Sequence, residues 1–515
     1  MVMAQEQDKH ETAGNKLILT APSTKMKQVI EKVEELARRE PEILVQLAKD
    51  RDGYAKTDKV FRELDKEHDC AARIDDLPDF SCELSFGPVE LQETGRPRLV
   101  TPLMMFVFLA LRGWFGSVSD SDAVERLTDS STLEEWLQDH KLRMPGRSTI
   151  HGVLNMISNT TREFILDCQI SMVSYLKLDD FSKVSIDSTS VAASTCWPTD
   201  SAMIVALLSQ AFGVFGKLPE VGIDGFKVHW CKTWLDKLNS LNSTINMIAG
   251  KPNSRSNVKK NYKEMLRVGQ KMMEHLIKQK ESLDADIQSL RMDLPPSHYF
   301  RLEEAWNKLD ETLAAVARVL HYTGNRVFNG IVLPSSEKVL SISDKAAAYI
   351  KKGDREPVIG YKPQIARSGN GFIASLILEQ GNPADVRMFK EVVDNVIVRT
   401  GTTPKTLSVD DGYSSTPNYK YAKDELKIEV VSFNGSKGRK FTPEQDWESD
   451  DYLNARNWRS SVESLMYVVK YSYDMKRMRR RGLSEVRAEM LEKVIAYNFF
   501  RMCLIEERLS ADKSA

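Results

Sequence analysis

Three carboxylic residues fall at places in the sequence where their side chains could bind a divalent metal ion. Asp187 lies in the short β-branched stretch SKVSIDSTS, Asp410 follows the apolar run TLSV, and Glu463 lies in RSSVESLMYVVK. Hard oxygen ligands of this kind suit Mg²⁺ or Mn²⁺, which keep open water positions for a substrate. Two such ions about 4 Å apart clamp an in-line phosphoryl displacement. The three acids are therefore candidate ligands of metal ions that catalyse phosphoryl transfer.

Each acid also has a simpler structural interpretation. Asp187 could cap a turn with the serine and threonine that follow it, and DDG at 410–412 could be a plain Asp-Gly turn. An Arg–Glu pair at i, i+4, such as Arg459 and Glu463, is common on exposed helices and contributes only a few tenths of a kcal/mol. Taken singly, these residues do not indicate catalysis, so the elements that carry them must decide.

Cations flank the third acid along one side of its expected helix. In RSSVESLMYVVK the apolar residues follow the i, i+3, i+4, i+7 spacing of an amphipathic helix, and Arg459, Glu463 and Lys470 are spaced i, i+4, i+11. At about 100° per residue these three lie within roughly 40° of one another. Beside a metal ligand, such cations could face phosphates and offset their charge. We expect the basic run that follows to extend this contact along a DNA backbone, through Lys476, Arg477, Arg479, Arg480 and Arg481.

The elements expected around the acids form a mixed sheet with a packed helix. An early strand ends near Asp187, and much later two β-like runs flank SGNG at 368–371 as a hairpin. A helix to about Thr400 follows, then a strand ending at Asp410, a helix, a strand and the helix of Glu463. This is the order of a ribonuclease-H-like (RNase H-like) sheet. Carboxylates at adjacent strand ends, with one from a packed helix, can converge in such a sheet.

The rest of the chain is expected to be helical. We expect a disordered tail, an N-terminal helical DNA-binding region, a catalytic core interrupted by a helical insertion, and a C-terminal helix. These segments cover residues 1–25, 26–175, 176–197 with 334–481, 198–333 for the insertion, and 482–515. Within the insertion, apolar residues at sevens predict an antiparallel helical hairpin over about 254–322, which we expect to serve assembly or DNA grip.

Two stretches of the N-terminal region have the pattern of a small DNA-binding bundle. SDSDAVERLTDSSTLEEWL and MPGRSTIHGVLNMIS could form a helix-turn-helix, although any helical bundle has similar capped turns. The apolar run from Leu103 predicts a buried helix with Thr101 as its N-cap and Pro102 in its first turn. That run is broken by Arg112 and is too short to span a bilayer.

Composition limits the partners and the compartment. The 515 residues carry a formal net charge of -1, so any contact with a polyanion must come from a local patch. None of the six cysteines forms a CxxC pair, which indicates neither a zinc site nor a disulfide framework. The polar N-terminal stretch MVMAQEQDKHETAGNK has no apolar signal segment. We therefore expect a cytoplasmic protein with reduced thiols and no membrane partner, associated with the nucleoid when bound to DNA.

These residues resemble the DDE transposases of bacterial insertion sequences, the group whose signature is Tyr-x2-Arg-x3-Glu-x6-Lys. Arg459, Glu463 and Lys470 match the last three positions, whereas Arg456 stands at the Tyr position. VDDGYSS resembles the family's x-Asp-x-Gly-Tyr segment, which places the second acid at Asp410 rather than at the residue after it. SIDSTSV followed by WPTDSAMI, and SISDKAAAYIKKGDREPVIGYKPQIARSGNGFI, resemble the ISNCY-type group.

The resemblance implies an α/β fold with an RNase H-like mixed-sheet catalytic core, an N-terminal helical domain and a long helical insertion. It implies a Mg²⁺-dependent nuclease and strand transferase that uses two Mg²⁺ (or Mn²⁺) ions on Asp187, Asp410 and Glu463. Its partners would be the terminal inverted repeats of the element and target DNA, bound by a homodimer. Two alternatives remain: a domesticated or inactive DNA-binding protein, and an RNase H-like nuclease that cannot join strands.

Overall fold

The structure, a computed structural model of the chain, describes residues 22–53, 99–115, 119–195, 199–224, 226–351 and 356–514. These residues fall into two compact units. The first comprises residues 1–52, 97–194 and 346–515, and it contains every strand described below. The second comprises residues 53–96 and 195–345, and its described part is helical.

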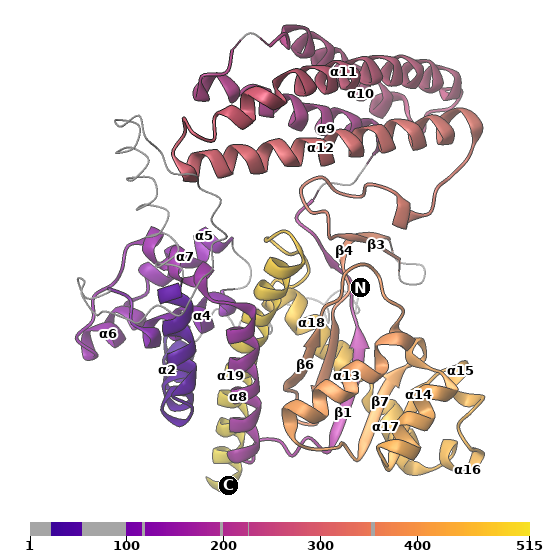
Figure 1. Cartoon of the computed structure of the whole chain (residues 1–515). Coiled ribbons are helices and arrows are strands. Elements are labelled where there is room, and N and C mark those ends of the chain that lie inside the picture. Colours follow the sequence, from indigo (N-terminus) through magenta and orange to yellow (C-terminus); the bar gives the residue numbers. More distant parts are fainter. Residues whose placement is uncertain are drawn as a thin grey trace, which may run out of the picture. The chain divides into compact units, whose positions relative to one another are not determined.

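A five-stranded mixed sheet lies at the centre of the first unit, in the order β6-β5-β1-β7-β8. Its strands are β1 (Lys183–Ser188), β5 (Gln364–Ser368), β6 (Ile373–Ile377), β7 (Thr406–Asp410) and β8 (Val430–Asn434). β6, β5 and β1 are antiparallel neighbours, whereas β1, β7 and β8 run parallel to one another. Figure 1 shows the early strand β1 lying among strands that come much later in the sequence. The middle of the sheet therefore forms by pairing of β1 with strands that follow residues 195–345 of the second unit in the sequence.

The register of β1 and β7 brings their last residues level. Ile186 pairs with Val409, so Asp187 and Asp410 follow at the same edge of the sheet. Beneath them, Ser185, Ser408 and the matching Ser432 of β8 form a buried row of small residues across three strands. Helix α17 (Asp450–Trp458) packs on this row, where the Ser408 hydroxyl donates to the Ala455 carbonyl at 2.9 Å. Small side chains allow this close approach of helix to sheet.

A smaller three-stranded sheet, and the chain segment that follows α18 (Ser460–Ser472), continue from the edge of the large sheet where Asp187 and Asp410 lie. The strands of the smaller sheet, in the order β2-β4-β3, are β2 (Val191–Ala192), β4 (Val358–Tyr361) and β3 (Ala348–Ile350). Gly360 is required in β4, because a Cβ there would lie 1.9 Å from the Val191 carbonyl oxygen. The chain after α18 returns to β2, where Ala192 donates to the Lys476 carbonyl and accepts from the Met478 amide.

Helices cover both faces of the large sheet. α13 (Asp385–Thr400) packs on β5 and β6, and α18 packs on β1 and β5. The long C-terminal helix α19 (Leu483–Ser514) packs along α4, α8 and α2. The helices of this layer are α2 (Pro22–Arg39), α4 (Pro102–Trp114), α5 (Asp120–Thr128), α6 (Ser131–Asp139), α7 (Arg147–Met156) and α8 (Asn159–Tyr175). Shorter turns connect the strands and α17: α14 (Thr416–Lys420), α15 (Ser436–Arg439) and α16 (Glu444–Trp447).

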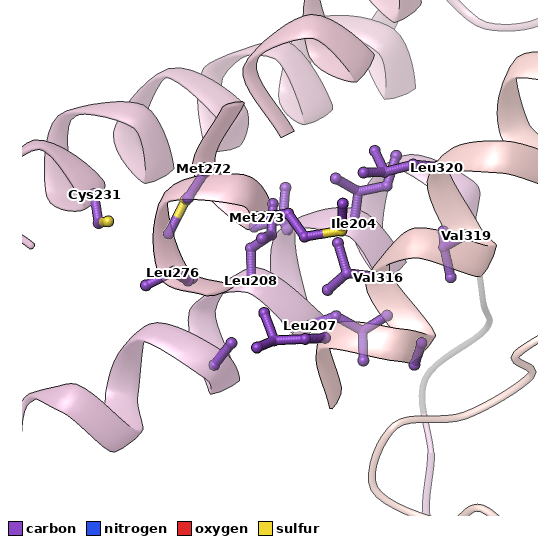
Figure 2. Close-up of a cluster of buried hydrophobic side chains, with 14 of the residues drawn as sticks. Ile204, Leu207, Leu208, Cys231, Met272, Met273, Leu276, Val316, Val319 and Leu320 are labelled. Atoms are coloured by element: carbon purple, nitrogen blue, oxygen red, sulfur yellow. The ribbon is translucent and has the colours of Figure 1, made fainter. Parts of the chain in front are cut away.

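In the described part of the second unit, four helices form the core, not the expected hairpin alone. α11 (Arg255–Ser289) and α12 (Pro296–Gly324) form that hairpin, and α9 (Asp200–Phe215) and α10 (His229–Ile248) pack against it. Figure 2 shows the shared core, in which Ile204 and Leu208 of α9 meet Met273 and Val316 of the hairpin. Among the described residues, Asp200–Val221 is long and apolar enough to cross a membrane, but half of its most apolar stretch is buried, as in the core helix of a bundle.

Two expected boundaries differ from the structure. The disordered tail predicted for residues 1–25 lies mostly outside the described residues, but Pro22–Lys25 already belong to α2. The helix expected from Arg459 begins at Ser460, and Arg459 is the junction between α17 and α18. Helical backbone angles at Arg459 (φ -51°, ψ -36°) let the two helices meet without a loop.

Candidate active site

The three predicted acids line one open cleft of about 1130 Å³ in the first unit. Asp187 ends β1 and Asp410 ends the neighbouring parallel strand β7, so backbone register alone sets these two side chains next to each other. Glu463 comes from the first turn of α18, which packs against β1 through its apolar face. The side chain of Asp187 is mostly buried at 13% exposure, whereas those of Asp410 and Glu463 are about half exposed.

A single guanidinium group, that of Arg459, contacts all three acids. Arg459 Nη2 lies 2.6 Å from Glu463 Oε1, and Nη1 lies 3.9 Å from Asp187 Oδ2 and 4.0 Å from Asp410 Oδ1. The i, i+4 pair with Glu463 is the surface ion pair that the simpler interpretation expects. The two longer contacts go beyond it, because one cation faces carboxylates from two strands and a helix.

Asp411, the alternative second acid, is used in the local fold. Its Oδ1 accepts hydrogen bonds from the backbone amides of Lys437 (3.2 Å) and Gly438 (3.1 Å) and from the Ser414 hydroxyl (2.9 Å). The carboxylate thus satisfies free amides in the turn α15, the usual task of a capping aspartate. Asp410, by contrast, lines the cleft.

A buried polar chain that the sequence interpretation missed supports the floor of the cleft. Lys362 Nζ lies 2.9 Å from Asp385 Oδ1 and donates to the Pro383 carbonyl at 2.9 Å. Gln364 also donates to Asp385, at 3.1 Å, and accepts from the Tyr413 hydroxyl. Burial favours a higher pKa for Asp385, but these hydrogen bonds hold the pKa below its ordinary value. Asp385 therefore stays ionised and paired with Lys362.

Tyr413 closes this chain directly under the acids. Burial raises the pKa of Tyr413 well above its ordinary value, and the charges of Asp385 and Asp187 add to the effect. The phenol remains a hydrogen-bond donor. Lys362 and Asp385 are distant in sequence, so their pairing could not be predicted. The one signal for this chain in the sequence is a lysine inside the apolar stretch VIGYKPQIA.

The same cleft is lined by an exposed edge of α18. Lys470, predicted to share the side of Arg459 and Glu463, lines it, and so do Tyr467 and Tyr471. The spacing i, i+4, i+11 thus brings the three predicted residues to one site. The apolar face of α18, with Val462, Leu465, Met466 and Val469, is buried.

The basic run after α18 divides into outward and inward residues. Lys476 lies over the Tyr471 ring at 5.3 Å, and Arg479 pairs with Asp474 at 2.7 Å and is half exposed. Arg477 is in the segment that bridges to β2, and the exposed Arg481 donates to the Ser194 carbonyl. Arg456, at the Tyr position of the signature, has its guanidinium 5.8 Å from the Trp447 ring.

Arg480 differs from the rest of the predicted DNA-binding run. Its side chain is 9% exposed and pairs with Asp120 at 2.9 Å and with the buried Glu492 at 3.0 Å. Burial favours a lower pKa for Arg480, but these carboxylates raise the pKa above its ordinary value. The guanidinium of Arg480 is thus paired within the protein, unlike the exposed cations of the run, and its contact with DNA stays a prediction.

The acid cluster fits a divalent cation in its donor chemistry. Within the described residues no group of three His, Cys, Asp or Glu side chains is already arranged as a metal site. At the cleft the Arg459 guanidinium lies within 4.0 Å of an oxygen of each of the three carboxylates, so one cation already contacts all three. Three oxygen donors of this type could hold Mg²⁺ or Mn²⁺ in its place.

Comparison with known families addresses the part of the chain that carries two of the acids. Residues 325–499 match the family described as Transposase DDE domain. The match covers about a third of the chain and includes Asp410, Glu463 and the cations of α18. No curated protein and no solved structure matches the chain. The DDE domain supports a transposase and implies a DNA substrate and an enzyme of the nuclease or transferase type.

The matched range leaves out Asp187. β1 lies before residue 325, yet it pairs with β5 and β7, which both lie inside the range. The strands of the matched range thus share one sheet with a strand from an earlier part of the chain.

Proposed function

We propose that this protein is a transposase that cuts the ends of an insertion sequence and joins the freed 3′-hydroxyl to target DNA. The observation that carries the proposal is the convergence of Asp187, Asp410 and Glu463 on one cleft around Arg459. The match of residues 325–499 to a transposase DDE domain supports it.

We infer that the large sheet is of the RNase H-like type and that the protein resembles the ISNCY group. The strand order β6-β5-β1-β7-β8, with an antiparallel half and a parallel half, supports the first inference. Arg459, Glu463 and Lys470 at signature spacing support the second.

Asp187, Asp410 and Glu463 would hold two Mg²⁺ or Mn²⁺ ions, which when bound activate the attacking hydroxyl and stabilise the leaving oxygen. Asp187 and Asp410 are positioned by paired strands, and rigid elements hold ligands more accurately than loops do. The ionised pair Lys362–Asp385 would fix the floor of the cleft without adding a free negative charge.

The cations of α18 and the chain after it would bind the DNA backbone. Lys470 and Arg459 would face the scissile and flanking phosphates, where cations stabilise developing charge. Lys476, Arg477, Arg479 and Arg481 would extend this contact. We further propose that a homodimer binds the element ends and target in the cytoplasm, with no membrane partner. The helical second unit would then serve assembly or DNA grip.

The proposal is tested with duplex DNA carrying the inverted repeats that we expect to flank the gene. Asp187→Ala, Asp410→Ala and Glu463→Ala should each reduce Mg²⁺-dependent nicking by several orders of magnitude, because each removes a ligand of the reacting centre. Binding of the duplex should change little. Asp411→Ala is the matched control, since its carboxylate caps α15.

The same preparations separate the alternatives. Joining of pre-cut ends to target DNA identifies a transposase, whereas nicking without joining identifies a nuclease. End binding with no nicking under any divalent ion would return the protein to an inactive DNA-binding role. Loss of nicking in Asp411→Ala but not in Asp410→Ala would show that the second acid is wrongly assigned.

A further inference from the structure

Two tyrosines on α18 expose their rings beside the acid cluster. Tyr467 is 59% exposed and Tyr471 is 54% exposed, and both line the cleft that contains Asp410 and Glu463. Their ring centroids are 4.6 Å apart with an interplanar angle of 37°. The two rings therefore form one continuous aromatic surface on the wall of the cleft.

The core of the first unit does not need this surface. The face of α18 that packs against the sheet consists of Val462, Leu465, Met466 and Val469. Tyr467 and Tyr471 lie at i, i+4 on the other side, where charged or polar residues ordinarily cover a surface helix. A pair of large rings at this place removes little apolar area from water, so a ligand is the better explanation.

Two lysines, one at the Tyr471 ring and one in the lining of the cleft, add positive charge to this aromatic surface. Lys476 Nζ lies 5.3 Å from the Tyr471 ring centroid, and Lys470 lines the cleft between the two tyrosines in sequence. Aromatic faces together with ammonium groups are the combination that binds single-stranded nucleic acid, because bases stack on the rings and phosphates pair with the cations. A protein partner with an apolar surface would gain nothing from these positive charges.

We propose that Tyr467 and Tyr471 form a stacking platform for an unpaired nucleobase of the DNA strand held at the acid cluster. This inference rests on the proposed function of the cleft. Tyr467 and Tyr471 follow Glu463 by four and eight residues, or about 6 and 12 Å along the helix axis. At about 3.4 Å per nucleotide, these distances correspond to about two to four nucleotides of one strand.

The platform would select unpaired DNA because bases within a duplex already have both faces covered by their neighbours. A displaced or terminal nucleotide offers a free face and costs less to unstack. The tyrosines would thus determine where along the strand the phosphate meets the acids. They are positioning residues and contact a base a few nucleotides from the reacting phosphate.

The test uses an oligonucleotide of about 16 nucleotides, single-stranded and as a duplex, with one fluorescent aminopurine base. Calcium in place of magnesium allows binding to be measured apart from cleavage. The double variant Tyr467→Ala/Tyr471→Ala should lose about ten-fold affinity for the single strand and the stacking quench of the aminopurine, with duplex affinity nearly unchanged. Tyr467→Phe/Tyr471→Phe keeps both rings and should bind as the wild type does.

Two results would overturn the platform. One is an alanine variant that is folded and binds and quenches the single strand like the wild type. The other is an alanine variant that changes the oligomeric state while keeping single-strand binding, which would assign the rings to a second copy. Failure of the proposed function is seen separately, as wild-type nicking by Asp410→Ala, because that variant keeps both tyrosines.

Discussion

Two ionic clusters in the first unit have opposite charge compositions: one has three arginines around a glutamate, and the other has three carboxylates around an arginine. In the helical layer, Arg112, Arg162 and Arg480 surround Glu492, with nitrogen–oxygen distances of 2.7, 2.7 and 3.0 Å. At the cleft, one arginine faces three carboxylates. The side chains of the first cluster are at most 9% exposed, whereas Glu463 in the second is 56% exposed.

Burial and the majority charge give these clusters different roles. In the buried cluster each arginine pairs with Glu492, because a buried charge with no opposite partner would cost several kcal/mol. Burial favours a higher pKa for Glu492, but the three arginines lower the pKa well below its ordinary value. In the cleft Asp410 and Glu463 are about half exposed, so we expect the arginine to be replaceable there by another cation. The first arrangement fixes helices, and the second can bind a ligand.

The same substitution in the two clusters should give the largest contrast. Glu492→Gln leaves three arginines without their shared partner and should lower the free energy of unfolding by about 3–5 kcal/mol. Glu463→Gln removes an exposed pair and should change it by less than about 1 kcal/mol. Thermal or urea unfolding, followed by circular dichroism, measures both. Equal losses would show that burial does not separate the clusters.

Acid titration sharpens this contrast. The pKa of Glu492 is lowered on folding, so its stabilisation is fully present above the ordinary glutamate range, near pH 4.3. It is lost progressively as the pH falls from that range through the lowered value. The stability difference between wild type and Glu492→Gln should therefore be constant from about pH 5 to 8 and shrink in strong acid. A difference that varies across the neutral range would contradict the assigned ionisation.

Smaller effects are expected from the cations of the cleft. Lys470→Ala and Arg459→Ala should melt within a few degrees of wild type, because both residues line an open cleft, where charge pairs contribute little. Each should reduce the salt dependence of end binding by about one unit, as expected when one phosphate contact is lost. Lys470→Ala should also slow nicking. Lower stability with an unchanged salt slope would leave Arg459 and Lys470 as members of a surface ion-pair ladder.

Local signals in the sequence predicted many elements correctly. The SGNG turn joins β5 and β6 as an antiparallel pair, β7 ends at Asp410, and Thr101 caps α4 by accepting from the Met104 amide. Each of these features depends on residues a few positions apart, so turn chemistry and periodicity are enough to find it. Spacing on α18 likewise brought Arg459, Glu463 and Lys470 to one cleft.

Contacts between distant residues were not predictable in this way. Arg480 sits in a run of cations that reads as a surface patch, and only folding brings Asp120 and Glu492 to it. Lys362 and Asp385 likewise meet only when β5 and α13 pack together. α10 also has apolar residues at sevens, as at Cys231, Leu238 and Ile245, but this spacing alone does not show which helices pack together in the four-helix core.

The central claim, that Asp187, Asp410 and Glu463 together bind a divalent cation, is tested most directly by titrating the DNA-free protein with Mn²⁺. Electron paramagnetic resonance measures the free ion that remains, without any need for activity. Wild type and Asp411→Asn should bind Mn²⁺, whereas Asp187→Asn, Asp410→Asn and Glu463→Gln should each bind it at least about ten-fold more weakly, as expected for loss of one charged ligand. Arg459→Ala should bind it more tightly, because the competing guanidinium is gone. Unchanged Mn²⁺ binding in all three acid variants would contradict the account.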